Sequence, residues 1–499
     1  MTPPRLYVDG AWCDGTGGRV DPVHDPATEA VIARVAYAAE VDVDRAVRAA
    51  HLAFPAWRAW GTERRCQVLR RTASLIAERA EPMAHALTAE QGKTLTESRA
   101  ELARAAETFA WHADAAPAVC APRLVGGGDT VVRPEPLGIV AAFAPWNYPA
   151  VIIARKLAAA LAAGCTVVLK AAEETPTIAV MLVDALAQAL ADADAPRGVV
   201  NLLFGDPPAI SNRLLMSPSV RVLSFTGSTA VGKQLAARAG ATLTRCILEL
   251  GGHAAAIVFD DANVDHAARA IAAYKFECAG QSCNAPSRIY VQQSVYDRFV
   301  DALVEAARAV RVGDGRDPSS DMGPMANPRR LTAMERLTAD ARSRGARVLT
   351  GGARLARRGW FWPPTVFVDV AADAALTIEE PFGPLAPVWP FDSAEEVLRR
   401  ANANPYGLAA YVFTTDAERA AGAASALEVG SVGINVLRGV SPDTGVAGVK
   451  DSGYGYEGGV PGMEAFLSLK VVRGMSRGVA HEQRAMARAA HADTGGAVS

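Results

Sequence analysis

Residues 138–170, GIVAAFAPWNYPAVIIARKLAAALAAGCTVVLK, decide the fold, because two short apolar runs flank a longer one. The short runs, at 139–143 and 166–169, have the length and composition of buried strands. The longer run between them has the length of a helix, and Gly164 follows it as a stop signal. The stretch therefore predicts a strand–helix–strand unit.

The same alternation continues on the C-terminal side as far as residue 251. Helix-length runs alternate with short apolar runs such as VVNLLFG and VRVLSFTG. Elements that alternate in this way, with short connections, form a parallel sheet covered by helices on both faces. A second alternating region spans residues 254–450, so the predicted fold class is α/β.

The chain before this unit has two other patterns. Residues 40–115 carry apolar residues at three- and four-residue spacing, which predicts helices. Residues 121–137 combine glycines, β-branched residues and prolines, which predicts an extended arm outside the core.

The composition indicates a globular protein whose cysteines are reduced. The 499 residues suggest two or three domains, and 50% are hydrophobic while 21% are charged. A net charge of −2 provides no bulk attraction to nucleic acid or to an anionic membrane, so neither is an expected partner. Seven scattered cysteines do not indicate a disulfide scaffold. Since no signal peptide or membrane span is recognisable, the expectation is a soluble, cytoplasmic protein.

Two segments have features of a dinucleotide site. In FTGSTAVGK, Gly227, Ser228 and Gly232 lie where a strand leads into a helix, whose N-terminal amides suit a phosphate. In VVLKAAEETP, Lys170 and Glu173 follow another strand, and a carboxylate there favours NAD over NADP because it repels a 2′-phosphate. Taken alone, the first segment is equally compatible with an ordinary turn, and the second with a solvated loop.

Other segments supply reactive groups. FECAGQSCNAP contains Cys278 and Cys283, and a thiolate is a nucleophile. LELGGH ends a strand with Glu249, and a glutamate in such a place is costly unless it is paired or used. PWNYP contains Asn147, whose amide suits an oxyanion, although an isolated asparagine in this context is more often a turn residue.

Together these motifs resemble those of the aldehyde dehydrogenase superfamily. PWNYP, FTGSTAVGK, LELGG, GQSC and EEPFGP occur in the order and at the spacing of that family, over residues 5–475. The wording of SFTGSTAVGK, ELGGH and KDSGYGYEGG resembles most the NAD-dependent succinate-semialdehyde dehydrogenase-like branch. The resemblance implies a Rossmann-type cofactor domain, an α/β catalytic domain and a small β oligomerisation arm.

The resemblance also implies a reaction, the oxidation of an aldehyde to a carboxylic acid through a cysteine thiohemiacetal and a thioester. Cys283 matches the nucleophile of the family, and Cys278 reads as a packed neighbour or, alternatively, as part of a disulfide or metal-bound off state. Asn147 matches the oxyanion donor and Glu249 the general base that activates water. Lys156 and Glu457 match positions that assist proton transfer.

The cofactor implied is NAD, with NADP as the alternative, and no metal site is expected. The positions that match cofactor contacts in the family are Trp146, Lys170, Glu173, Gly227, Ser228, Gly232, Glu380 and Phe382.

The substrate is an aldehyde whose identity the resemblance leaves open. Arg155 matches an arginine that binds a substrate carboxylate, but Glu277 occupies the position of a second arginine, and Val446 replaces an aromatic residue. One hypothesis is that Glu277 and Val446 turn the site away from succinate semialdehyde, toward neutral or amino-aldehydes. The alternative is that Glu277 pairs with Arg155 or turns away from the site.

The expected domain organisation also follows the family. Residues 1–115 and 137–251 form the NAD-binding domain, 252–451 the catalytic domain, and 116–136 with 467–476 an arm that makes a homodimer or homotetramer. Residues 477–499 are expected to be a mobile tail, with a basic amphipathic helix as the alternative.

Two other functional classes compete with a dehydrogenase. A non-catalytic dinucleotide-binding protein can be built on the same fold, although the presence of both Cys283 and Glu249 favours catalysis. An acyl-transferring thiol enzyme is disfavoured, because relatives that pass the acyl group to coenzyme A or to phosphate tend to lack a base comparable with Glu249.

Overall fold

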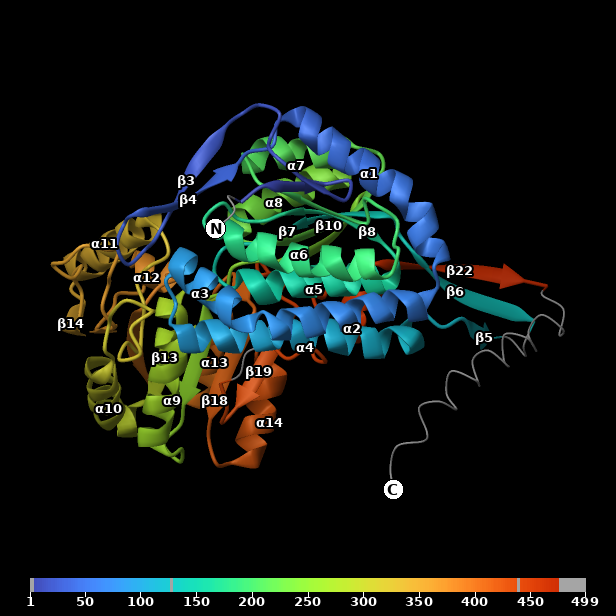
Figure 1. Ribbon diagram of the computed structural model, residues 1–499. Helices are drawn as coiled ribbons and strands as arrows, with labels where there is room; N and C mark the ends of the chain where they lie inside the picture. Colours follow the sequence, from blue (N-terminus) through green and yellow to red (C-terminus); the bar gives the residue numbers. More distant parts are fainter. Residues whose placement is uncertain (1–3, 126–128, 438–439, 475–499) are drawn as a thin grey trace, which may run out of the picture.

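The computed structural model describes residues 4–125, 129–437 and 440–474 (Figure 1). Two large sheets, each with its own hydrophobic core, and a projecting three-stranded sheet organise these residues. The predicted tail at 477–499 lies outside the described residues. The predicted domain boundaries at 115, 137 and 251 remain predictions, although the two cores lie on either side of residue 252 for most of the chain.

The first sheet has the strand order β2-β1-β9-β8-β7-β10-β11-β21. Its five central strands, from β9 to β11, are parallel, and three antiparallel strands complete its edges. Since β8 follows β7 on one side while β10 lies on the other, the strand order reverses between β7 and β10, where open α/β sheets bind ligands. The strands are β1 (Leu6–Val8), β2 (Ala11–Cys13), β7 (Ile139–Phe143), β8 (Thr166–Lys170), β9 (Val200–Leu203), β10 (Val220–Thr226), β11 (Arg245–Glu249) and β21 (Gly453–Tyr454).

Helices cover both faces of this sheet, as the sequence predicts (Figure 1). α5 and α6 lie on one face, with α2 and α4 packed outside them, while α1, α7 and α8 lie on the other face. Gly164 ends α5 in the left-handed conformation, at φ 94°, which explains the stop signal. The helices are α1 (Glu40–Ala59), α2 (Thr62–Glu78), α3 (Ala80–Gln91), α4 (Leu95–Val119), α5 (Pro149–Ala163), α6 (Pro176–Asp192), α7 (Pro207–Met216) and α8 (Thr229–Ala241).

The second sheet has the strand order β14-β15-β16-β13-β12-β18-β19, and only β14 is antiparallel to its neighbour. Its strands are β12 (Ala254–Val258), β13 (Pro286–Gln292), β14 (Arg347–Thr350), β15 (Thr365–Val368), β16 (Leu385–Phe391), β18 (Ala409–Phe413) and β19 (Ser431–Ile434). The helices of this part are α9 (Val264–Phe276), α10 (Tyr296–Ala309), α11 (Pro328–Ser343), α12 (Ala375–Ile378), α13 (Ala394–Asn402) and α14 (Ala417–Ala426).

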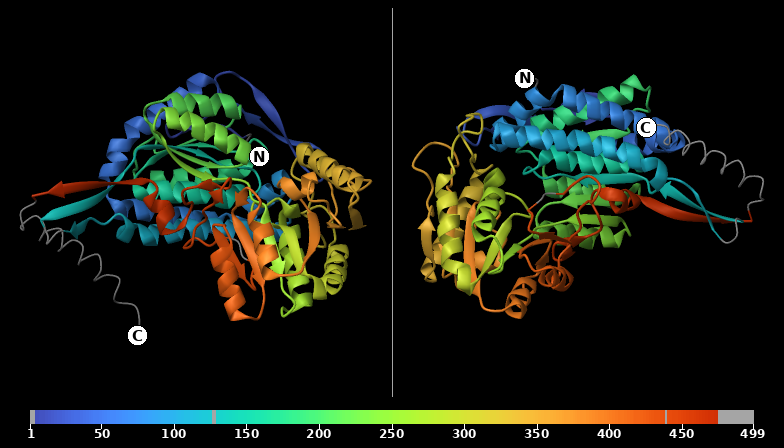
Figure 2. Two further views of the ribbon diagram at one scale, coloured as in Figure 1. Left: turned by 180° about the vertical axis from the view of Figure 1, so that it is seen from behind. Right: turned by 90° about the horizontal axis from the view of Figure 1, so that it is seen from below.

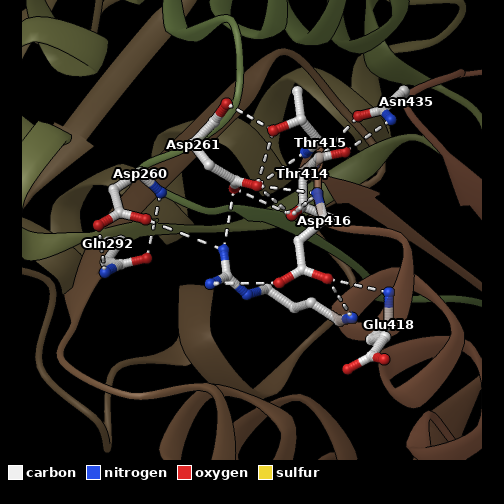
Figure 3. Close-up of polar contacts among 9 residues, drawn as sticks. Asp260, Asp261, Gln292, Thr414, Thr415, Asp416, Glu418 and Asn435 are labelled. Carbon is white, nitrogen blue, oxygen red and sulfur yellow. Dashed lines mark hydrogen bonds and ion pairs between the residues drawn. The ribbon is translucent and has the colours of Figure 1, made fainter.

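A polar network ties neighbouring strands of the second sheet together at their ends (Figure 3). Asp261, which follows β12, accepts hydrogen bonds from the Thr414 hydroxyl after β18 and from the backbone N–H of Asp416 at 2.9 Å. Asp416 in turn caps α14. Arg419 donates to Asp261 at 2.9 Å, so this acidic cluster is paired and has a structural role.

The third sheet projects from the body of the molecule, in the order β22-β6-β5 (Figures 1 and 2). β6 (Thr130–Pro136) pairs along its whole length with β22 (Leu467–Arg473), and β5 (Arg123–Val125) pairs with its other edge. These strands lie within the predicted extended segment at 121–137 and the late strand at 467–476, and their role in oligomerisation stays a prediction. Residues 116–119, at the start of the predicted arm, form the last turn of α4.

Two connections cross between the large sheets. The ribbon of β3 (Val20–His24) and β4 (Val31–Ala36) reaches the second part, where the Trp360 N–H donates to the Pro26 carbonyl at 2.9 Å. After β19 the chain pairs β20 (Val449–Lys450) with β17 (Tyr406–Gly407), adds β21 to the first sheet and forms α15 (Gly459–Glu464). Residues 452–466, which belong to no predicted domain, therefore return to the first part of the molecule.

Within the described ranges, none of the helices combines the length and the apolar character needed to cross a bilayer.

Candidate active site

A cavity of about 650 Å³ lies where the strand order of the first sheet reverses and the second part of the molecule faces it. The loop after β7 contributes Trp146 and Asn147, and the loop after β10 contributes Gly227 and Ser228. Because the two parts of the chain meet here, residues far apart in the sequence form one wall. The further predicted residues in this cavity are Arg155, Glu249, Glu277, Cys283, Glu380, Phe382 and Val446.

Cys283 and Glu249 form the reactive pair of this cavity. The Cys283 thiol donates a hydrogen bond to Glu249 Oε1 at 3.1 Å and lies 3.3 Å from Asn284 Oδ1. Burial, and next the charge of Glu457, raise the pKa of Glu249 to about 7. Burial and the neighbouring Glu249 carboxylate raise the pKa of the Cys283 thiol well above its usual value. In this arrangement the proton lies on the sulfur, and Glu249 is within hydrogen-bond distance to accept it.

Two glycines after β11 allow the chain there to pass close to Cys283 and Glu380. A Cβ atom on Gly252 would lie 2.2 Å from the Cys283 carbonyl oxygen, and one on Gly251 would lie 2.6 Å from Glu380 Oε2. The backbone N–H of Gly252 donates to Glu380 Oε1 at 2.9 Å. Glycine at 252 is thus required by close contact with the backbone of the loop that carries Cys283.

The turn before Cys283 is conformationally strained. Cys278 and Ala279 have left-handed φ values of 51° and 52°, and Gly280 continues at 70°. The Cys278 side chain is 2% exposed and accepts a hydrogen bond from Gln91 Nε2 at 3.2 Å, and burial raises the pKa of its thiol to about 12. Cys278 is therefore a packed thiol in this structure, and a redox role remains untested.

Asn147, just before α5, is held by hydrogen bonds of its side-chain amide and of its backbone carbonyl. Its side-chain Nδ2 donates to the Gln281 carbonyl at 3.0 Å, in the turn that carries Cys283. Its backbone carbonyl accepts a hydrogen bond from Lys93 Nζ at 2.8 Å. Asn147 is therefore fixed relative to the cysteine turn, and its amide has a second N–H available for a ligand.

A buried ion pair beneath Asn147 supports this loop. Lys93 and Glu101 are both fully buried and paired with each other. The Glu101 carboxylate also accepts the backbone N–H of Ala150 at 2.8 Å, at the N-terminus of α5, where negative charge is favourable. Neither residue belongs to a recognisable motif, so the sequence analysis missed this support.

Lys156 and Glu457 lie close enough to Glu249 for their charges to influence its pKa, Glu457 raising it and Lys156 lowering it. Lys156 Nζ donates to Glu457 Oε2 at 2.6 Å and to Ser224 Oγ at 3.1 Å. Thr226 Oγ1 also donates to Glu457 Oε2, at 2.9 Å, while the buried Glu457 Oε1 has no hydrogen-bond partner among the described atoms. The structure thus brings both predicted residues close to the base without placing them on the cavity wall with Cys283.

A second cavity of about 600 Å³ adjoins the first and shares Trp146, Gly227 and Ser228 with it. At its end, Lys170 Nζ donates to Glu173 Oε2 at 2.8 Å. Glu173 Oε1 accepts the backbone N–H of Gly205 at 2.9 Å. The two predicted residues therefore lie together at the carboxyl edge of the sheet.

The N-terminus of α8 faces both cavities. Ser228 is its N-cap residue, and its hydroxyl makes no capping hydrogen bond to the helix amides. Gly232 has a different position, because a Cβ atom there would lie 2.3 Å from Leu250 Cδ2. Gly232 therefore permits α8 to pack closely on the chain after β11, and among the described residues it is not part of either cavity wall.

Glu380 and Phe382 line the first cavity. Burial raises the pKa of Glu380 to about 7. The Phe382 ring meets the Trp146 ring edge to face, with centroids 5.6 Å apart. Arg330 lies 5.6 Å from the Phe382 ring centroid and donates to its carbonyl at 3.2 Å, a contact that the sequence did not indicate.

The far end of the first cavity contains the three predicted substrate residues. Glu277 does not pair with Arg155. Instead, its Oε1 accepts a hydrogen bond from the Tyr148 hydroxyl at 3.2 Å. Arg155 donates to the Val440 carbonyl at 3.4 Å, and Val446 forms a β-bridge with Glu457.

Arg104 also lines this end of the cavity and was not predicted. It lies in the middle of α4, within a regular helical pattern, so no local signal distinguishes it. Across the part of the chain that the structure describes, no group of three His, Cys, Asp or Glu side chains is arranged to hold a metal ion.

The sequence profile of the aldehyde dehydrogenase family matches residues 12–472. Two relatives extend over nearly the whole chain. 4-(Hydroxymethyl)benzenesulfonate dehydrogenase TsaD1 of Comamonas testosteroni is 43% identical over 470 residues, which cover 94% of this chain and 97% of the relative. The NADP(+) succinate-semialdehyde dehydrogenase GabD of Escherichia coli K12 is 40% identical over 472 residues, covering 93% and 96%.

A solved structure shows the same fold. The crystal structure of an E. coli NADP-dependent enzyme superposes with a TM-score of 0.91 at 39% identity, covering 94% of this chain and 98% of the other. The predicted fold class is therefore confirmed. With the family matched over this length and the cysteine–glutamate pair beside a dinucleotide-sized cleft, the chain belongs to the aldehyde dehydrogenase family and is an enzyme of NAD(P)-dependent aldehyde oxidation.

Proposed function

We propose that this enzyme converts an aldehyde to a carboxylic acid through a thiohemiacetal and a thioester on Cys283. The observation that carries the proposal is the 3.1 Å hydrogen bond from the Cys283 thiol to Glu249 inside a cavity. A thiol is activated as a nucleophile when an adjacent base takes its proton. Glu249, with a pKa raised to about 7 by burial, has the affinity for a proton that this transfer needs.

In the first step the Cys283 sulfur adds to the aldehyde carbon while its proton moves to Glu249. Negative charge then develops on the carbonyl oxygen. The Asn147 amide, which is anchored to the Gln281 carbonyl at 3.0 Å, and the Cys283 backbone N–H are the donors proposed for that oxygen.

In the last step Glu249 takes a proton from water, the water oxygen attacks the thioester carbon, and the C–S bond breaks to release the acid. Lys156 and Glu457 are proposed to pass protons away from Glu249. Their 2.6 Å contact and the charge that Glu457 exerts on Glu249 support this role.

The second cavity fits a dinucleotide. Its position where the strand order reverses, the uncapped amides of α8 at Ser228, and the Lys170–Glu173 pair are the features such a cofactor requires. We propose that Lys170 and Glu173 hold the adenine ribose, and that Gly227 and Ser228 hold the pyrophosphate. The nicotinamide riboside would lie against Trp146, Glu380 and Phe382. When bound, the nicotinamide accepts the hydride from the substrate carbon.

NAD is proposed as the preferred cofactor because the Glu173 carboxylate lies where a 2′-phosphate would meet it. Two of the relatives described above are named for NADP, so the preference needs a direct comparison of both cofactors.

The protein is proposed to be a cytoplasmic homodimer or homotetramer, with an NAD-binding domain at 1–115 and 137–251 and a catalytic domain at 252–451. All seven cysteines are free thiols, which suits a reducing compartment. The projecting arm exposes Leu469 and Val471, on one face of β22, to solvent in the single chain.

Two substrate classes compete. Relatives named for succinate semialdehyde and for 4-(hydroxymethyl)benzenesulfonate suggest an aldehyde with an acidic group. Glu277 at the cavity wall suggests a neutral aldehyde or an amino-aldehyde.

The proposal is tested by NADH and NADPH formation with a panel of acidic, neutral and amino-aldehydes. Cys283→Ala is expected to abolish reduction of the cofactor, while Cys278→Ala retains it. If Cys283→Ala keeps activity, the assignment of the nucleophile is wrong. If no aldehyde is oxidised, a non-catalytic dinucleotide-binding protein becomes the better assignment.

A further inference from the structure

We propose that Arg104 and Arg155 together bind an anionic group, a carboxylate or a sulfonate, at the end of the substrate aldehyde remote from the carbonyl. This inference rests on the proposed function, because it assigns the substrate class of the same cavity. It goes beyond that function by naming a specificity residue, Arg104, that no sequence motif marks.

Arg104 lies in the cavity wall with a hydrogen-bonding capacity that the protein does not use. Its Nε is buried and has no hydrogen-bond partner among the described atoms. Its guanidinium carbon is 5.9 Å from the Tyr148 ring centroid. Leaving a buried charged donor without an acceptor costs about 1–3 kcal/mol, and a ligand with acceptor oxygens would remove that cost.

Neither arginine of the wall is neutralised by the protein. Within the described ranges, no carboxylate lies within ion-pair distance of Arg104 or Arg155. The hydrogen bond of Arg155 to the Val440 carbonyl occupies only one of its five N–H groups. The buried Arg288, by contrast, has its guanidinium satisfied by the backbone carbonyls of His253 and Ala401, at 2.8 and 3.0 Å.

The glutamate of this wall does not cancel the two positive charges. Glu277 Oε1 is occupied by the Tyr148 hydroxyl at 3.2 Å. Two guanidinium groups and one carboxylate leave this end of the cavity with a net positive charge. The geometry therefore favours an anionic substrate and disfavours an amino-aldehyde.

The charges of the two arginines reach different titratable groups of the cavity. The charge of Arg155 reaches the reactive pair, since it is among the influences that oppose the burial-driven rise in pKa of Cys283 and Glu249. The charge of Arg104 instead opposes the burial-driven rise in pKa of Tyr274, on α9. Arg104 lines the same cavity as Cys283, with its guanidinium carbon 5.9 Å from the Tyr148 ring centroid. Tyr148, Tyr274 and Val446 supply the apolar walls between the two ends.

The experiment compares pairs of aldehydes that differ in the anionic group: succinate semialdehyde with butanal, and 4-formylbenzoate with 4-methylbenzaldehyde. For Arg104→Met, kcat/KM for the two acids should fall about 30-fold or more, mainly through KM, because a charged hydrogen bond is lost. The values for the two neutral aldehydes should change less than about threefold. Arg104→Lys keeps the positive charge but not the paired N–H donors of a guanidinium. Its kcat/KM for the two acids should lie between those of the wild type and Arg104→Met.

Arg99→Met is the matched control, since Arg99 lies on the same helix, is exposed and pairs with Glu81. It should leave all four substrates unaffected. Inhibition of butanal oxidation by succinate should weaken in Arg104→Met and Arg104→Lys but not in the control.

Equal losses on acids and neutral aldehydes, or unchanged use of the acids by Arg104→Met and Arg104→Lys, would overturn the assignment of Arg104. A wild-type enzyme that oxidises the neutral aldehydes better than the acids would also overturn it, while leaving the proposed reaction intact. Failure of the wild-type enzyme on all four aldehydes would instead count against the proposed function itself.

Discussion

Glu249 has a carboxyl whose pKa is near 7 because it is buried and lies close to the Glu457 carboxylate. At neutral pH such a group is present in both protonation states, so it can accept a proton from the Cys283 thiol and later from water. The same burial makes ionised Glu249 unfavourable for stability, as is common for groups at active sites.

Replacing Glu249 with glutamine should stabilise the fold, and more at pH 8 than at pH 5.5. The unfolded carboxyl releases its proton near its ordinary pKa of 4.5, while the folded one keeps it until about pH 7. Rising pH between these values therefore favours the unfolded wild type, by roughly 3 kcal/mol in all. The glutamine variant has no such loss, so the difference in Tm between variant and wild type should widen as pH rises.

Thermal unfolding at several pH values checks this, with Glu305→Gln, at an exposed position on α10, as the control. If the Tm difference between Glu249→Gln and the wild type stays constant or narrows toward pH 8, the pKa of the Glu249 carboxyl is not raised.

The sequence predicts the site best at reactive residues that stand in recognisable motifs. Cys283, Glu249 and Asn147 stand in motifs, and the structure brings them into one cavity. The cofactor contact of Gly232 stays a prediction, and the structure adds a packing reason for the glycine, because a Cβ atom there would lie 2.3 Å from Leu250 Cδ2. Arg104 was not predicted, since an arginine within a helical pattern is ordinarily a solvated surface residue.

At the scale of elements, the site is formed where β11 leads into β12. Glu249 ends β11, Gly251 and Gly252 follow, and β12 begins the second sheet. Glycine at 252 lets this connection pass the Cys283 carbonyl, with only 2.2 Å for a Cβ atom. The approach of the base to the nucleophile therefore depends on a position without a side chain.

Gly252→Ala should lower kcat at least about 100-fold, because the added methyl must displace the Cys283 backbone, and misplacement by about 1 Å is costly in catalysis. Gly240→Ala, near the end of α8, adds a methyl with no heavy atom within 4 Å and should leave kcat unchanged. Steady-state kinetics on both variants, with Tm as a check on folding, distinguish a local shift from global unfolding. Full activity in Gly252→Ala would contradict the close contact.

The alternating elements from β7 to β11 were predictable because buried parallel strands are continuous apolar runs between helical periodicities. The edge strands were not, since β1, β2 and β21 have two or three residues each and no distinctive pattern. Nor could the sequence indicate that residues 452–466 return to the first sheet, since this depends on long-range pairing such as Leu248 with Tyr454.

For the whole molecule, the projecting arm is notable because in a single chain it leaves an apolar strand exposed at the edge of its sheet. β22 forms one edge of its sheet and exposes 59% of Leu469 and 48% of Val471 on the same face. An exposed apolar strand at an edge tends to pair with another chain. This supports the proposed homo-oligomer.

The double substitution Leu469→Lys and Val471→Lys should convert the oligomer to monomers, because it places charge on the apolar face of β22. Light scattering coupled to size-exclusion chromatography measures the mass directly. Leu52→Lys, on the exposed side of α1, serves as the control and should leave the mass unchanged. A wild-type mass equal to one 52.2 kDa chain, or an unchanged oligomer in the double variant, would contradict the role of the arm.

The central claim, a covalent acyl group on one sulfur, is tested most directly by peptide mass spectrometry of enzyme quenched in acid during turnover. In the wild-type enzyme the mass of the acyl group should map to Cys283 and not to Cys278, five residues away. Cofactor reduction accompanied by an acyl mass on another side chain, or by none, would contradict the account.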